Sequence, residues 1–217
     1  MTFLELTRGP LLEASLYILV IGVLWRLVGI LALRRKPDYS EPRSRATWRG
    51  ALRGIVKRMW PKRAFASRTL YSTVMGYAFH IGLAIVVFGF GPHILFIREL
   101  TGLSWPGLSN GAIYFWGAVT IAAMVALLIR RLTHPVLRHL SNFDDYFSWL
   151  VTLLPVVTGL WAVANVGARY ETLLALHLLS VEVLFIWLPF GKLMHAFLVF
   201  LSRGTTGANF ARKGAGI

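Results

Sequence analysis

The chain has 217 residues, of which 56% are hydrophobic and 15% charged, and it contains no cysteine. This apolar share exceeds the roughly 45–50% of a soluble domain, and with a mean hydropathy of +0.62 it indicates an integral membrane protein. The lack of cysteine excludes disulfides, iron–sulfur ligation by this chain and the attachment of a c-type haem. Basic loops facing the cytoplasm explain the net charge of +14 better than nucleic-acid binding does.

Five stretches are long and apolar enough to cross a bilayer, which takes about 20 residues of helix. None shows the alternation of polar and apolar residues that is typical of an outer-membrane barrel. We therefore expect an all-α, multi-pass membrane protein with one domain over residues 1–217. The predicted spans cover residues 14–33, 69–97, 109–130, 146–168 and 172–202.

Lysine and arginine are concentrated in the first connection, residues 34–68, in the third-to-fourth connection and in the C-terminal tail. Basic residues gather on the cytoplasmic side, and five spans put the chain ends on opposite sides. We therefore expect the N-terminus outside and the C-terminus in the cytoplasm, in the inner (cytoplasmic) membrane. Residues 46–60 of the basic loop place apolar side chains on one helical face, which fits a helix in the membrane interface, a solvated loop or a docking surface for a partner.

The chain has six histidines. Two of them, His134 and His139, fall in an arginine-rich loop, where we expect them to be solvated. Ionisable side chains inside a membrane span are usually functional, and the other four occupy such positions. These are His80 and His93 in the second predicted span and His177 and His195 in the fifth.

The spacing of the four histidines predicts two pairs at matched depths. His177 and His195 are 18 residues apart, so on one helix they point the same way about 27 Å apart. The second and fifth spans run in opposite directions, which puts His80 level with His195, toward the cytoplasm, and His93 level with His177, toward the outside. Two imidazoles opposed at one depth can supply both axial ligands of a haem iron. We therefore predict two haem b groups, an inner one at His80–His195 and an outer one at His93–His177.

The position of His93 requires a break in the second span. It follows His80 by 13 residues, which is not a whole number of helical turns. The intervening GFGP, residues 89–92, is expected to bend the chain, because proline interrupts the helical hydrogen bonds and glycine permits bending. If it does not, the outer haem is missing.

Three basic side chains and one acid complete the candidate site. Arg26 and Lys192, and more weakly Arg68, are predicted partners of the anionic haem propionates. The alternatives are a structural ion pair for Arg26 and snorkelling to the interface for Lys192. Glu182 either relays protons to and from quinone or stays protonated between helices.

Several motifs together resemble the γ subunit of respiratory nitrate reductase, a five-span di-haem cytochrome b. They are FHIG at 79–82, LLIRRLTHPVLR at 127–138, LPFGKLMH at 188–195 and the VLWRL that contains Arg26. The resemblance covers nearly the whole chain. It implies that His80 and His195 hold the inner haem and that His177 serves the outer one.

The chain also departs from that subunit. Better-known members carry the second span-two histidine ten residues after the first, where this chain has Phe90. Their quinol site also uses an outer-loop lysine that has no counterpart here. These differences indicate a relative, and the wider family resembles membrane cytochromes of heterodisulfide-reductase-like and sulfite-reduction-associated complexes. This implies a cytoplasmic iron–sulfur subunit and a catalytic subunit as partners, membrane lipid around the chain, and quinone, often menaquinone, as substrate.

The predicted function is therefore electron transfer across the membrane between quinol and an iron–sulfur partner, in either direction. The chain supplies no bond-making catalysis beyond quinol oxidation. Two alternatives fit the same residues. One is a mono-haem or haem-free anchor of a soluble oxidoreductase, and the other is a proton-coupled transporter.

Overall fold

The computed structural model describes residues 1–33 and 38–216, so residues 34–37 of the predicted basic loop lie outside it. Within this described part, five helices are long and apolar enough to cross a membrane, and no strand is present. They run over Phe3–Ala32, Arg63–Gly89, Asn110–Thr133, Phe143–Ala164 and Tyr170–Trp187. The expected all-α, multi-pass membrane protein is confirmed.

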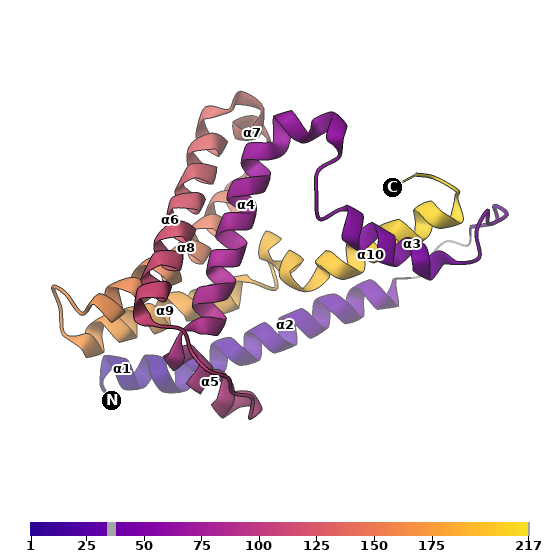
Figure 1. Ribbon diagram of the computed structural model, residues 1–217. Helices are drawn as coiled ribbons and strands as arrows, with labels where there is room; N and C mark the ends of the chain where they lie inside the picture. Colours follow the sequence, from indigo (N-terminus) through magenta and orange to yellow (C-terminus); the bar gives the residue numbers. More distant parts are fainter. Residues whose placement is uncertain (34–37, 217) are drawn as a thin grey trace.

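The spanning helices pack in a chain of neighbours. The elements are α1 (Phe3–Leu6), a π-helical turn (Thr7–Leu11), α2 (Leu12–Ala32), α3 (Thr47–Lys57), α4 (Arg63–Gly89), α5 (Gly91–Thr101), α6 (Asn110–Thr133), α7 (Pro135–Leu140), α8 (Phe143–Ala164), α9 (Tyr170–Trp187), a 3-10 turn (Lys192–Met194) and α10 (His195–Arg212). Helix α4 packs on α6, α6 on α8, α8 on α9 and α9 on α2 (Figure 1). Helices α4 and α9 are not neighbours in this series.

Small residues allow the close packing of α4, α6 and α8. A Cβ added at Gly82 of α4 would lie 2.3 Å from the hydroxyl oxygen of Thr120 in α6. A Cβ added at Gly117 of α6 would lie 2.8 Å from the side chain of Leu160 in α8. Close approach of helix backbones is the usual basis of helix association in lipid, where burial of apolar surface gives little driving force.

The second predicted span, 69–97, is divided into two helices. Helix α4 ends at Gly89, Phe90 is extended with φ −81° and ψ 127°, and α5 begins at Gly91 with Pro92 in its first turn. Proline suits the start of a helix because it has no N–H to leave unpaired. The carbonyl of Gly89 instead accepts a hydrogen bond from the N–H of Leu108 at 2.8 Å. The expected bend at GFGP is confirmed, but as a complete break, so the helix does not continue to residue 97.

The fifth predicted span, 172–202, is also divided. Helix α9 ends at Trp187 and α10 begins at His195, so the two histidines of this segment lie on different helices. The expectation that they share one straight helix is therefore wrong. Pro189 cannot donate to the helical ladder, and its fully buried ring lies so close to Gly22 of α2 that a Cβ there would meet it at 2.7 Å.

The boundaries of the other three spans also differ from the prediction. The first helical span begins at Phe3, well before residue 14, because the helix continues past Pro10 through the π-helical turn. The third extends to Thr133 and the fourth begins at Phe143, while Asn165, in the left-handed region at φ 51°, ends the fourth.

Helices α3 and α10 form a separate pair beside the bundle (Figure 1). They approach so closely that a Cβ at Gly54 would lie 2.7 Å from the Cα of Gly207. The Nε of Arg212 also lies 3.3 Å from the carboxylate of Asp38, which ties the first loop to α10. Hydrogen bonds from the Ser40 hydroxyl and backbone N–H, followed by the charge of Arg212, hold the pKa of Asp38 below its ordinary value. The basic loop and the C-terminal helix therefore occupy the same end of the molecule.

Candidate functional site

The structure brings His80 of α4 and His195 of α10 together. Their ring centres lie 6.1 Å apart, with an angle of 72° between the ring planes. The Nδ1–H of His80 donates to the carbonyl of Gly76 at 2.7 Å, and the Nδ1–H of His195 donates to the carbonyl of Lys192 at 2.8 Å. Each imidazole is therefore held by Nδ1 and keeps Nε2 available as a ligand atom.

His93 of α5 and His177 of α9 form a second pair. Their ring centres also lie 6.1 Å apart, and their planes differ by 21°. The Nδ1–H of His93 donates to the carbonyl of Val86 at 3.2 Å. That carbonyl lies seven residues back, a distance of about 10 Å along a continuous helix, so only the break after Gly89 permits this contact.

Helix α8 orients His177. The Thr158 hydroxyl donates to the carbonyl of Leu154 at 2.7 Å, which leaves its oxygen able to accept from Nδ1 of His177 at 3.3 Å. The neighbouring Gly159 has no side chain, and a Cβ there would lie 3.0 Å from the imidazole. His177 on α9 therefore also has its Nδ1 engaged by the protein.

The spacing of both pairs suits a metal held between two imidazoles. Metal–imidazole bonds of about 2.0–2.1 Å on opposite sides of one ion place the ring centres about 6.3 Å apart. The described residues contain no group of three or more histidine, cysteine, aspartate or glutamate side chains placed to hold a metal. A set of two imidazoles therefore fits a metal that brings its other ligands with it, as haem iron does. A Cβ added at Gly76 would meet no atom within 4 Å, which leaves open space beside His80.

A large basic cavity adjoins the first pair. It measures about 1410 Å³ and is lined by residues of α2, α10 and the two connections that precede α4 and α10, including Arg26, Lys192 and His195. Arg26 has no hydrogen-bond or ion-pair partner within the described chain. The Nζ of Lys192 lies 2.5 Å from the carboxylate of Asp145. Two of the three predicted propionate partners therefore face the same cavity as His195.

Arg68 does not line this cavity. It lies on an exposed position of α4, where its backbone carbonyl accepts a hydrogen bond from Arg130 at 3.4 Å. Of the three predicted propionate partners, only Arg26 and Lys192 line the cavity beside His195.

One relative matches the chain over almost its full length. It is a protein of Nitratidesulfovibrio vulgaris strain Hildenborough that carries only the name "Protein", and it is 32% identical over 213 residues, or 96% of this chain and 93% of the relative. The chain belongs to the same family as this protein. No protein-family model and no solved structure matches the chain. The name of this relative gives no information about activity. The resemblance to the nitrate reductase γ subunit therefore remains a prediction.

Glu182 of this chain lies at a buried position in α9. It is 3% exposed, and its Oε1 atom has no hydrogen-bond partner among the described residues. Burying a carboxyl oxygen without a hydrogen-bond partner costs folding free energy. Such an atom therefore usually has a functional role or an additional partner. The sequence prediction of a proton-handling or interhelical role remains open to test.

The acidic residues at the start of α8 are site residues that the sequence did not reveal. Both carboxylate oxygens of Asp144 accept from the backbone N–H of Lys192, at 3.2 and 3.1 Å. Asp145 pairs with Lys192 and, at 3.1 Å, with Arg131. The capping box that Asp145 forms with Asn142 marks the start of α8 in the sequence. No sequence pattern near Asp144 and Asp145 shows that they bind the turn before His195.

Proposed function

We propose that the chain is the di-haem b-type cytochrome subunit of a respiratory membrane complex. It carries electrons between a quinol, such as menaquinol, and a cytoplasmic iron–sulfur partner, which is joined to a catalytic subunit. The observation that carries the proposal is the pairing of four membrane histidines into two sets with the same ring separation of 6.1 Å. Haem, when bound, supplies reversible one-electron transfer.

The inner site is assigned to His80 and His195 and the outer site to His93 and His177. The backbone carbonyls and the Thr158 hydroxyl that accept from Nδ1 fix the orientation of each imidazole. Hydrogen bonding at Nδ1 also raises the basicity of Nε2, the nitrogen available as a ligand.

Two basic residues and one acidic residue have supporting roles in the proposed function. Arg26 and Lys192 supply positive charge beside His195, where anionic propionates need it. Quinol oxidation releases protons, and Oε1 of Glu182 is a buried acceptor atom without a competing partner. In the reverse direction the same atom delivers a proton to the quinone.

Haem content tests the proposal directly. The purified protein is expected to contain two haem b groups per chain by pyridine haemochrome assay, with b-type bands in the reduced-minus-oxidised spectrum. His80→Ala and His195→Ala should each reduce the ratio to about one, and the double variant should also retain about one, because both remove the same site. The combination of His80→Ala with His177→Ala should lose both haems.

His139→Ala is the matched control, because this histidine is exposed in α7 and outside both pairs. It should leave the ratio at two. A wild-type ratio of one would contradict the di-haem proposal and favour a mono-haem anchor, and a haem-free protein would favour the anchor or transporter alternatives.

A further inference from the structure

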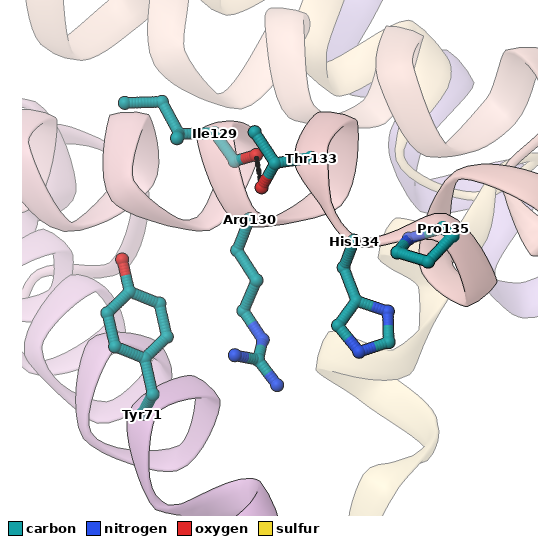
Figure 2. Close-up of a pocket in the computed structure, with 6 residues that line it drawn as sticks. All are labelled: Tyr71, Ile129, Arg130, Thr133, His134 and Pro135. Carbon is teal, nitrogen blue, oxygen red and sulfur yellow. Dashed lines mark hydrogen bonds between the residues drawn. The ribbon is translucent and has the colours of Figure 1, made fainter.

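A second cavity lies outside both histidine pairs, beside the end of α6 that leads into α7. It measures about 390 Å³ and is lined by Tyr71, Ile129, Arg130, Thr133, His134 and Pro135 (Figure 2). None of these residues is acidic. The cavity therefore carries positive charge at the end of two membrane-spanning helices.

Arg130 is the main charge in this cavity and is incompletely satisfied. Its guanidinium lies over the ring of Tyr71, 5.3 Å from the ring centre, and one terminal nitrogen donates to the carbonyl of Arg68 at 3.4 Å. The Nε atom is buried and has no hydrogen-bond partner among the described residues. By contrast, the neighbouring Arg131 pairs with Asp145. A buried guanidinium N–H without an acceptor favours the arrival of an anionic oxygen.

His134 provides a second donor next to Arg130. It follows Arg130 by one helical turn, and both side chains project from the same side of the chain toward the cavity (Figure 2). The imidazole is exposed, so an external group can reach it. Two donors on one side of a helix suit the several oxygens of a phosphate group.

The cavity opens onto an apolar helix surface. Ile129, which lines the cavity, is 55% exposed, and Val125, one turn further into the predicted span, is 38% exposed. On α4, Val74 is exposed one turn beyond Tyr71. A ligand with a phosphate group and hydrocarbon chains would satisfy both the polar cavity and this surface.

We propose that this cavity binds the headgroup phosphate of an anionic phospholipid. The phosphate oxygens accept from Arg130 and His134, and the acyl chains follow the face formed by Val125 and Ile129. Basic pockets between membrane helices on the cytoplasmic side are known to take such headgroups. Free inorganic phosphate shares the polar chemistry but has nothing to place on the apolar face.

Lipid titration of the full-length protein tests the proposal. The protein is delipidated in neutral detergent and titrated by native mass spectrometry with phosphatidylglycerol, with diacylglycerol as a phosphate-free analogue. Phosphatidylglycerol should bind the wild type, and Arg130→Gln should weaken this binding at least about tenfold, because a charge-assisted hydrogen bond is lost. His134→Gln, at an exposed position, should weaken it by a smaller factor without affecting folding.

Arg138→Gln is the matched control, because it removes the same charge from an exposed position of α7 outside the cavity. Its phosphatidylglycerol affinity should equal that of the wild type. Equal weakening by Arg138→Gln, or no effect of both Arg130→Gln and His134→Gln, would overturn the proposal. It would also be overturned if diacylglycerol bound as tightly, or if inorganic phosphate competed at the same concentration as the lipid.

Discussion

His177 is held from the side by a different helix, and this contact shows how single residues shape the site. Thr158 and Gly159 are neighbours on α8, and one supplies a hydrogen-bond acceptor while the other supplies space. The acceptor orients the ring, and the missing side chain lets α8 come close enough to do so. Neither role is visible from the position of His177 in its own helix.

Gly159→Ala should disturb this arrangement. The added methyl would lie 3.0 Å from Cε1 and 3.2 Å from Nδ1 of His177, closer than ordinary contact. Overpacking of this kind costs about 1–3 kcal/mol, so the thermal unfolding temperature in detergent should fall. If haem binds as proposed, the absorbance of the His93–His177 site should change while that of the other site does not.

Gly29→Ala is the control for this experiment. Gly29 lies in the interior of α2, and a Cβ there would meet no atom within 4 Å. Replacing a helical glycine with alanine gains about 0.5–1 kcal/mol, so the unfolding temperature should stay the same or rise slightly. An equal fall in both variants would show that crowding at His177 is not the cause.

At the scale of elements, the most consequential feature is the break between α9 and α10. It is stabilised by the N-terminal turn of α8, where Asp144 accepts from the N–H of Lys192 and from the hydroxyl of Ser148 at 2.7 Å. Ser148 in turn accepts from the indole N–H of Trp187, the last residue of α9, at 2.9 Å. A short network thus joins the end of one helix to the turn that carries His195.

Asp144→Ala should loosen this turn. It leaves the N–H of Lys192 and the Ser148 hydroxyl without their acceptor, which costs about 1–3 kcal/mol. We expect a lower unfolding temperature and, if haem binds as proposed, earlier loss of haem from the His80–His195 site than from the other site on heating. Glu171→Ala, which removes the acid of an exposed ion pair in the first turn of α9, should change stability by no more than about 0.5 kcal/mol. Equal effects of the two substitutions would contradict the assigned role of Asp144.

At the scale of the whole molecule, the pairing of α3 with α10 unites the first basic loop and the C-terminal segment. Basic residues of both parts, among them Arg58 and Arg203, line the cavity beside His195. This end of the molecule is the one that the charge distribution predicts to be cytoplasmic. The His80–His195 pair, which we propose holds the inner haem, thus lies at the end where the proposed cytoplasmic partner would dock.

Labelling tests the orientation, and the absence of native cysteine makes it simple. Tyr39→Cys places a thiol in the first loop, where Tyr39 is 92% exposed, and Ser104→Cys places one in the exposed loop after α5. A membrane-impermeant maleimide should label position 104 in cells with a permeable outer membrane and intact inner membrane, and position 39 only after lysis. The opposite pattern would contradict the predicted topology.

The number of spans and the identities of the paired histidines followed from the sequence itself. Apolar runs of membrane-spanning length are a local property, and the reversed order of histidines along antiparallel helices predicted His80 with His195 and His93 with His177. The structure brings together both of these pairs. The break at residues 89–92 was also readable, because proline and glycine act on the local backbone.

Tertiary structure alone decided where α9 ends and what orients the histidines. Hydropathy measures the transfer of side chains into lipid and does not report whether the helix is continuous, so residues 172–202 looked like one span. The break there depends on Gly22 of α2 admitting Pro189 and on Asp144 of α8 binding the turn. These partners are distant in sequence, and only packing of the helices brings them within hydrogen-bond or van der Waals distance.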